Sequence, residues 1–346
     1  MNNLPIVSII IPCRNEEKFI GKCLDSIIAN DYLKNDLEIL VSDGMSEDKT
    51  REIVKRYSKV YPFISLINNV KKIIPAALNM GIQNSKGKII IRMDAHNIYR
   101  KDYISQSVKC LYEYNADNVG GLWIVLPVNN TIIAKSIALS LSNFFGAGNA
   151  HYKIGTDAPK YVDTVPFGCY KREVFDKIGF FDEDMIRNED DEFNHRLIKN
   201  GGKILLCPEI VSYYHPRESL LKTWRMYYQY GYFKPLVAKK VGSVLTWRQL
   251  MPTIFISSLF ITAIFSFLVT KVAWIFFIII ILYVVTNLIV SLNIAIKKCF
   301  KCFLFLPIIF TILHFSYGFG YLKGIWDFIV LKRHRRKKIE DVPLTR

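Results

Sequence analysis

Three long, nearly uncharged runs in the last third of the sequence constrain the fold most strongly. They cover residues 251–269, 273–296 and 303–321, and each approaches or exceeds the length that a helix needs to cross a bilayer. Hydrophobic residues make up 51% of the 346 residues, which is high for a purely soluble protein, and the excess lies in these runs. The sequence therefore predicts a membrane region at 241–331, with a basic tail at 332–346.

The first 240 residues instead show the pattern of an α/β domain. Apolar, strand-like runs at 6–12, 37–42, 64–67 and 88–93 alternate with helical patterns at 17–30, 48–60 and 75–85. Ser46 is expected to cap the helix that begins near residue 48. This order predicts a Rossmann-like, mainly parallel sheet with helices on both faces.

Cysteine usage and the start of the chain indicate the compartment. Met1 to Pro5 lack the basic stretch and apolar core of a secretory signal, so we expect the first domain in the cytoplasm. The seven cysteines lack paired metal-binding spacing. We expect free thiols, including Cys299 and Cys302, with zinc binding as a remote alternative.

The net charge of +16 is concentrated near the apolar runs. Lys297, Lys298 and Lys301 separate the second and third runs, and the segment 332–338 is entirely basic. This placement favours anionic lipid headgroups over nucleic acid, which we do not expect as a partner. Since basic loops tend to face the cytoplasm, the sequence predicts a multi-pass protein of the plasma membrane or cell inner membrane whose first domain is cytoplasmic.

The basic tail creates a conflict, because three full crossings would leave it on the far side of the membrane. The third run contains Pro307, His314, Gly318 and Gly320, which are uncommon in a simple spanning helix. It could dip into the membrane and return, or lie in the interface. The sequence leaves both alternatives open.

Polar residues follow three of the expected strands. Asp94 and His96 come after the strand at 88–93, Asp43 ends the strand at 37–42, and Arg14 to Glu17 follow the first strand. Open α/β sheets place their chemistry at the carboxyl ends of parallel strands, so this edge is the expected site. A glycine-rich dinucleotide motif and a phosphate-binding loop ending in Lys-Ser or Lys-Thr are both missing, which argues against a dinucleotide enzyme or P-loop ATPase.

A set of short motifs, in this order, resembles the inverting family-two glycosyltransferases of the GT-A fold, especially bacterial enzymes of the succinoglycan type. The motifs are Ile11 to Glu17, Ser42 to Thr50, Asp94-Ala95-His96, Val165 to Gly168 and Asn188 to Glu192. Each is weak alone, but together they span the soluble two-thirds of the chain.

The resemblance implies a nucleotide site at the first two strand ends. Pro12, Arg14, Asn15 and Glu16 would surround base and ribose, Asp43 would contact the uracil edge, and Asp94 would contribute from the third strand end. The residues alone allow a plainer interpretation, in which Asp43-Gly44 is a turn and Asn15 caps a helix.

The resemblance also implies a divalent ion that bridges the donor diphosphate, held by Asp94 and His96. Most family members carry a second aspartate where this chain has His96, and the imidazole favours Mn²⁺ over Mg²⁺. His215 is a third candidate ligand, although a structural histidine beside a turn is the alternative.

Among the acids at 189–192, the family's spacing aligns Asp190 with the base that takes a proton from the acceptor hydroxyl. Asp191 is the nearest rival, and a charged helix start is the alternative for the whole cluster. Trp123 could stack on a sugar face or pack in a core.

These observations predict a membrane-attached enzyme that moves a hexose, with inversion, from a nucleotide sugar, first of all a UDP-sugar, to a polyprenyl-linked saccharide in exopolysaccharide or surface-glycan assembly. A processive polysaccharide synthase and a non-catalytic membrane scaffold are the alternatives. Gln-x-x-Arg-Trp, which processive synthases usually show, is missing. The donor sugar, the acceptor and the oligomeric state are left open.

Overall fold

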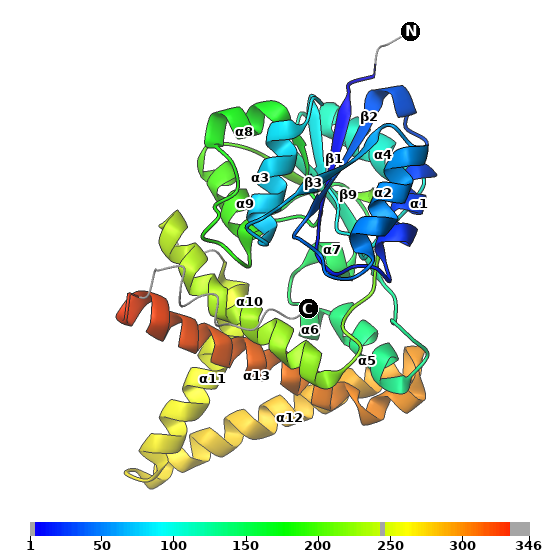
Figure 1. Cartoon of the computed structure of the whole chain (residues 1–346). Coiled ribbons are helices and arrows are strands. Elements are labelled where there is room, and N and C mark those ends of the chain that lie inside the picture. The colour runs from blue at the N-terminus through cyan, green and yellow to red at the C-terminus, as the bar shows by residue number, and fades with distance from the viewer. Residues whose placement is uncertain (1–3, 243–245, 333–346) are drawn as a thin grey trace. The chain divides into compact units, whose positions relative to one another are not determined.

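Backbone contacts divide the chain into two compact units, which are described separately. The computed structural model describes residues 4–242 and 246–332 (Figure 1). Within these residues, the first unit comprises 4–124 and 151–214, and the second comprises 125–150, 215–242 and 246–332. The predicted domain boundary near residue 240 followed hydropathy and not contacts, so it stays a prediction.

The first unit is built on a sheet that has nine strands in the described part of the chain. Their order is β3-β2-β1-β4-β8-β6-β9-β5, and β7 pairs with β9 outside this path. The strands are β1 (Val7–Cys13), β2 (Leu37–Asp43), β3 (Ile64–Asn68), β4 (Ile89–Arg92), β5 (Ile98–Tyr99), β6 (Asn118–Val125), β7 (Lys160–Tyr161), β8 (Cys169–Lys171) and β9 (Ile204–Tyr214).

The sheet is mixed. The four strands β3, β2, β1 and β4 are parallel, as the alternation of strands and helices predicts. From β8 onward the pairing changes, because β8 runs antiparallel to both β4 and β6, and β5 and β7 run antiparallel to β9. The α/β class is therefore confirmed, while the expectation of a mainly parallel sheet holds for only one half.

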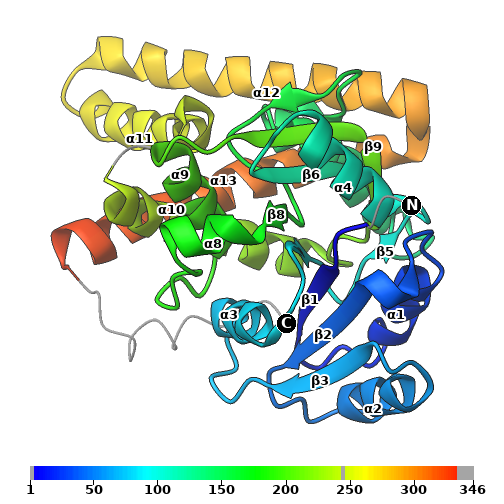
Figure 2. The same cartoon turned by 90° about the horizontal axis from the view of Figure 1, so that it is seen from above.

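Successive residues of β1 point to opposite faces of the sheet, as the pleat of a strand requires. Ile9 and Ile11 pack with residues of α1, α2 and α4, whereas Ile10 packs with residues of α3, α8 and α9 (Figure 2). Both faces are thus covered by helices. The helices of this unit are α1 (Ile20–Ile28), α2 (Thr50–Val60), α3 (Ile74–Asn84), α4 (Tyr103–Glu113), α7 (His151–Ile154), α8 (Arg172–Ile178) and α9 (Glu189–Lys199), with a short 3₁₀ turn, η1 (Lys34–Asp36).

The second unit is helical. Its elements are α5 (Ile132–Leu141), α6 (Phe144–Ala147), α10 (Leu220–Val241), α11 (Trp247–Ser266), α12 (Thr270–Lys298), a 3₁₀ turn η2 (Phe300–Leu304), α13 (Leu306–Gly324) and a π-helical segment η3 (Ile325–Val330). Helices α10 and α13 approach so closely that a Cβ on Gly320 would lie 2.1 Å from the carbonyl oxygen of Tyr228. A Cβ on Gly231 would lie 2.1 Å from the carbonyl oxygen of Tyr317. Only glycine fits these two positions.

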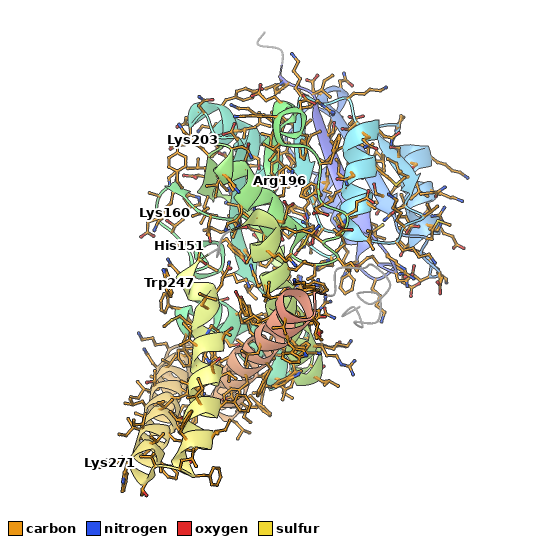
Figure 3. All side chains as sticks on the ribbon, turned by 90° about the vertical axis from the view of Figure 1, so that its left-hand side faces the viewer. His151, Lys160, Arg196, Lys203, Trp247 and Lys271 are labelled. Atoms are coloured by element: carbon orange, nitrogen blue, oxygen red, sulfur yellow. A yellow bond between two sulfur atoms is a disulfide. The ribbon has the colours of Figure 1, made fainter. Side chains whose placement is uncertain are left out.

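Three described helices are long and apolar enough to cross a membrane: Gln249–Ser266, Thr270–Lys298 and Leu306–Val330. Helix α12 has no charged residue between Lys271 and Lys297. Lys271 lies at the tip of the α11–α12 hairpin, at the end of α11 away from Trp247 (Figure 3). Lysines at both ends of an apolar helix can extend their ammonium groups to the two membrane surfaces.

The third apolar helix is more enclosed than the other two. In its most apolar window 44% of residues are buried inside the structure, compared with 11% for each of the others. It runs continuously from Leu306 to Val330, which does not fit the alternative in which this run dips into the membrane and returns. A position in the membrane interface stays a prediction.

The structure also corrects the expectation for two cysteines. Cys299 and Cys302 form a disulfide, because the turn at η2 brings their Cα atoms to 5.4 Å. The other five cysteines are free and buried, as expected. The basic run after Lys332 lies outside the described residues.

Candidate active site

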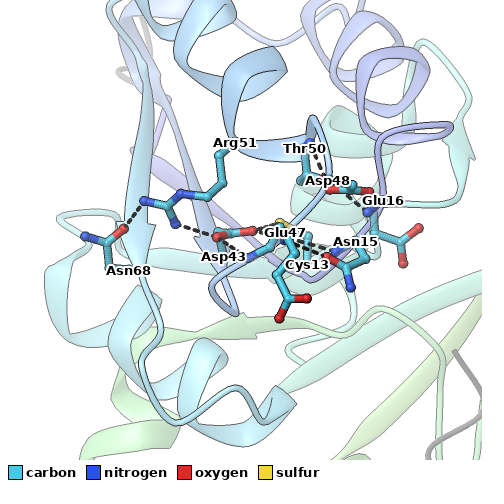
Figure 4. A network of polar contacts seen from close by, with 10 residues as sticks. Cys13, Asn15, Glu16, Asp43, Glu47, Asp48, Thr50, Arg51 and Asn68 are labelled. Carbon is cyan, nitrogen blue, oxygen red and sulfur yellow. Dashed lines mark hydrogen bonds and ion pairs between the residues drawn. The ribbon is translucent and has the colours of Figure 1, made fainter.

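The loops that follow β1 and β2 are joined by hydrogen bonds (Figure 4). Cys13 and Asp43, the last residues of the two parallel strands, lie in register. Beyond them, the backbone N–H of Asn15 donates to Ser46 Oγ at 2.8 Å, and Asn15 Oδ1 accepts from the N–H of Glu47 at 2.9 Å. Asn15 has a φ of 55°, in the left-handed region that asparagine tolerates better than most residues. The side chain of Asn15 therefore bridges two loops and does not cap a helix.

The next residues of the first loop connect to the start of α2. The N–H of Glu16 donates to Thr50 Oγ1 at 2.7 Å, and the N–H of Glu17 donates to Asp48 Oδ2 at 3.1 Å. Asp48 Oδ1 accepts from the N–H of Thr50 at 3.0 Å. Burial raises the pKa of Asp48, but these hydrogen bonds outweigh it and hold the pKa below its usual value. Asp48, rather than Ser46 as predicted, holds the first turn of α2.

Asp43 is fully buried and its carboxylate already has protein partners. Arg51 Nη1 lies 2.5 Å from Oδ2, and Ser46 donates through both its backbone N–H and its hydroxyl. Arg51 also donates to Asn68 Oδ1 at 2.7 Å. The sequence analysis missed Arg51, although its place in the first turn of α2, after the acidic turn, was a usable signal. Contact between Asp43 and a base stays a prediction.

Pro12 and Arg14 lie on either side of Cys13, the last residue of β1, and differ in how exposed they are. Pro12 lies beside Ser42 on β2 and is half-buried. The Arg14 side chain is 40% exposed and its guanidinium lies 3.9 Å from Glu47, an exposed contact that water screens. Arg14 is thus a charged group that a ligand at this edge could reach.

Asp94 and His96 follow β4 at the same edge. Tyr99 holds the backbone of Asp94 on both sides, because its hydroxyl accepts from the N–H at 2.7 Å and donates to the carbonyl at 3.2 Å. The Asp94 side chain is 23% exposed and Oδ1 lies 3.4 Å from Arg92 Nε. The His96 ring meets the edge of Tyr214, with centroids 6.2 Å apart. A carboxylate and an imidazole are thus carried by one short turn.

This turn contains an unsatisfied polar group. The Asn97 side chain is 1% exposed, and neither its amide nitrogen nor its oxygen has a hydrogen-bond partner in the described structure. A buried amide of this kind indicates a further polar partner, such as water or an ion, and the oxygen and nitrogen donors nearby fit Mn²⁺ or Mg²⁺.

The third predicted ligand, His215, directly follows Tyr214 and begins the second stretch of chain that belongs to the second unit. Within residues 4–242 and 246–332, the only three potential metal ligands with atoms within 4.8 Å of one another are Cys110, Cys207 and Glu209. The predicted set Asp94, His96 and His215 therefore stays a prediction.

Arg92, the last residue of β4, links this turn to the start of α9. Its side chain is 12% exposed, and Nη1 lies 3.0 Å from Glu189 Oε1 while Nε faces Asp94. Burial lowers the pKa of Arg92, but Asp94, then Glu189 and Asp190, outweigh it and raise the pKa above its usual range. The sequence analysis missed Arg92, because nothing in the sequence indicates that a cation at a strand end faces acids about a hundred residues later.

The predicted base lies in the first turn of α9. Asn188 enters this helix with a left-handed φ of 63°, and the N–H of Asp191 donates to Asp190 Oδ1 at 2.9 Å. Both aspartates are half-buried. Arg196, on the next turns, pairs with Glu192 at 2.7 and 2.8 Å. The attraction between Asp190 and Arg92 places Asp190 in the same charge network as Asp94, and its role as base stays a prediction.

Trp123 packs inside an aromatic cluster. Its ring stacks on Tyr214 at 4.3 Å and contacts Tyr152 at 5.1 Å and Phe167 at 5.3 Å. The Lys153 ammonium lies 5.6 Å from its centroid. This surrounding favours the packing role over stacking on a sugar.

The fold is of the GT-A type. The structure is similar to that of a mannosyltransferase, PcManGT from Pyrobaculum calidifontis, in complex with GDP-Man and Mn²⁺, with a TM-score of 0.60 and 19% identity over 94% of this chain and 88% of that one. The Glycosyl transferase family 2 model matches residues 8–179.

Two relatives extend beyond that domain. A dolichyl N-acetyl-alpha-D-glucosaminyl phosphate 3-beta-D-2,3-diacetamido-2,3-dideoxy-beta-D-glucuronosyltransferase of Methanococcus voltae is 30% identical over 92% of this chain and 97% of its own length. The succinoglycan biosynthesis protein ExoA of Rhizobium meliloti is 27% identical over 70% of this chain and 73% of its own. The chain belongs to glycosyl transferase family 2, as its motifs predicted.

Proposed function

We propose that this glycosyltransferase is attached to a membrane and moves a hexose, with inversion, from a nucleotide sugar to a polyprenyl-linked saccharide. UDP-sugars are the first donors to test. The pathway is assembly of an exopolysaccharide or related surface glycan. The first unit faces the cytoplasm, where nucleotide sugars are made.

The observation that carries this proposal is the buried Arg92 between two groups of acids. Its guanidinium lies 3.4 Å from Asp94 and 3.0 Å from Glu189, the residue before Asp190. Arg92 thereby links Asp94, which is suited to binding the sugar donor, to the start of α9, which is suited to activating the acceptor. A transfer reaction needs these two functions close together.

On the donor side, the joined loops would bind the nucleotide. Pro12, Arg14, Asn15 and Glu16 would line base and ribose, with Asp43 at the base edge. A divalent ion, Mn²⁺ or Mg²⁺, held by Asp94 and His96 with His215 as a third candidate, would neutralise charge on the diphosphate. The Mn²⁺ in the structure of PcManGT supports a divalent ion.

On the acceptor side, Asp190 would accept the proton of the attacking hydroxyl. The hydroxyl oxygen then forms a bond to the anomeric carbon as the bond from that carbon to the diphosphate oxygen breaks on the opposite face, which inverts the configuration. The positive charge of Arg92 attracts the Asp190 carboxylate and so ties the proposed base to the donor side. Asp191 is the alternative base.

The lipid-linked acceptor is supported by the relatives and the apolar helices. The Methanococcus voltae relative is named for a dolichyl-phosphate-linked sugar, and it matches nearly the whole chain, including the helical unit. The Rhizobium meliloti relative is named for succinoglycan biosynthesis. Three helices long enough to cross a membrane would keep the enzyme beside such a lipid.

The test measures nucleoside diphosphate release from UDP-, GDP- and dTDP-sugars by the full chain in membranes, with Mn²⁺ or Mg²⁺ and a polyprenyl-linked acceptor extract. We expect metal-dependent release from one donor, reduced about 10²–10⁴-fold in Asp190→Asn. Asp191→Asn, the neighbouring matched control, is expected to lose less than about tenfold. A reversed order would make Asp191 the base, and no release with any donor would favour the scaffold.

A further inference from the structure

An apolar groove opens between α12 and α13 in the helical unit. It has a volume of about 420 Å³, within the range of small-molecule sites. Its walls include Trp224 from α10, Val284 and Leu288 from α12, and Ile308, Ile312 and Phe315 from α13.

The polar residues at this groove bond to protein partners. Asn287 donates to the carbonyl of Pro307 at 3.0 Å and to Thr311 Oγ1 at 3.3 Å, and its oxygen accepts from Ser291 at 3.2 Å. Thr311 in turn donates to the carbonyl of Pro307 at 2.9 Å. Because these groups satisfy one another, the groove presents hydrocarbon and aromatic surface to an occupant.

One end of α12 carries positive charge. Lys297 and Lys298 close this helix, Lys301 follows in η2, and all three side chains are exposed. Between residues 246 and 332 the only acid is Asp327, which pairs with Lys323 at 3.0 Å. Along the helix axis, Leu288 is about 14 Å from Lys297 at 1.5 Å per residue. The apolar groove thus lies close enough to these three lysines for a single lipid molecule to contact both.

We propose that this groove binds the isoprenoid tail of a polyprenyl phosphate, with the phosphate directed toward Lys297, Lys298 and Lys301. The inference rests on the proposed function, in which the acceptor is polyprenyl-linked. A single groove suits a lipid with one chain, whereas a common phospholipid carries two. The lysines complement the phosphate charge, and their number on this side agrees with a cytoplasmic location.

The test measures equilibrium binding of radiolabelled undecaprenyl phosphate to the full chain in detergent micelles. Val284→Trp fills the groove, and Val285→Trp is its matched control, because Val285 is the next residue, is equally exposed and does not line the groove. We expect Val284→Trp to weaken binding about tenfold or more, since a displaced tail loses several buried methylene contacts. Val285→Trp should bind within about twofold of the wild type. Equal binding by both variants would overturn the proposal.

Two further arms identify the ligand chemistry. Dioleoyl phosphatidic acid should compete at least about tenfold less well than undecaprenyl phosphate, and geranyl phosphate, whose tail is too short to fill the groove, should also compete weakly. Equal competition by phosphatidic acid would make the groove an unselective lipid crevice and overturn the proposal. Changing Lys297, Lys298 and Lys301 together to Gln should weaken the binding of undecaprenyl phosphate but not that of undecaprenol, which has no phosphate.

The measurement of lipid binding does not depend on catalysis. If Val284→Trp loses lipid binding while the wild type transfers sugar from no donor, the groove assignment stands and the proposed function falls. If the wild type transfers sugar to the lipid and Val284→Trp binds and transfers equally well, the proposed function stands and the groove assignment falls.

Discussion

The polar edge of the first unit and the α10–α13 pair of the second are both tightly packed, but by different means. At the polar edge, defined by Asp43, Arg51, Arg92, Asp94 and Glu189, partly buried cations neutralise buried and partly buried carboxylates. In the helix pair, backbones meet at Gly231 and Gly320 without any charge at the contact. The first arrangement is sensitive to loss of a charge, and the second to addition of a single carbon atom. The predictions below test this difference.

The largest effect is expected for Arg92→Met. The substitution leaves the buried Glu189 and the partly buried Asp94 without their cation, and breaking a buried ion pair costs about 3–5 kcal/mol. The melting temperature of the first transition should fall by on the order of 10 °C in a thermal scan of the solubilised chain. Arg92→Lys keeps the positive charge, so its melting temperature should fall by less. A melting temperature unchanged in Arg92→Met would show that these acids are not held by Arg92.

Arg51→Met should come next. It removes the guanidinium 2.5 Å from the fully buried Asp43, but Ser46 still donates to that carboxylate. We therefore expect a loss of about 2–3 kcal/mol. The same thermal scan measures this loss of stability. Arg56→Met is the control, because Arg56 also lies on α2 but does not pair with Asp43. An effect as small as that of the control would mean that Ser46 alone stabilises Asp43.

Gly320→Ala tests the helix pair. The new Cβ would lie 2.1 Å from the Tyr228 carbonyl oxygen, so α10 and α13 must separate at a cost of about 2 kcal/mol. Hydrogen exchange of α13 amides should become faster. Gly21→Ala in α1 is the control, because its Cβ would meet nothing closer than 3.7 Å. Equal exchange in Gly320→Ala and the wild type would contradict the close contact.

The smallest effect is expected for Lys71→Met. Lys71 lies 2.6 Å from Glu183, closer than Arg92 lies to Asp94 or Glu189, but its side chain is 52% exposed. Exposed pairs contribute about 0–1 kcal/mol, so the melting temperature should hardly change. A loss as large as that of Arg51→Met would show that proximity, not burial, determines the effect.

The sequence predicted the parallel half of the sheet because its strands are long and apolar. It did not predict the antiparallel half, since β5, β7 and β8 have two or three residues each, too few for a pattern. β9 continues through Pro208 to Tyr214, although a proline usually interrupts a strand. β7 pairs with β9 at Leu205 and Leu206 and β5 pairs with it at Ser212 and Tyr213, so Pro208 lies between these two paired stretches.

The candidate site was likewise predictable only in part. Residues at strand ends could be identified because motif and strand lie together in the sequence, as for Asp43 and Asp94 with His96. Their partners could not be, because Arg92 and Glu189 meet only through the packing of β4 against β8 and the helix that follows. Charge pairs between distant segments leave no local signal in one sequence.

The hydrogen bonds between the two loops of the first unit have a consequence for the thermodynamics of donor binding. Five bonds, between residues 15–17 and 46–50, order both loops before any ligand arrives. A nucleotide that binds there would not have to immobilise a mobile segment, so little of its interaction free energy would be lost to conformational entropy. Binding at this edge should therefore have a small entropic penalty.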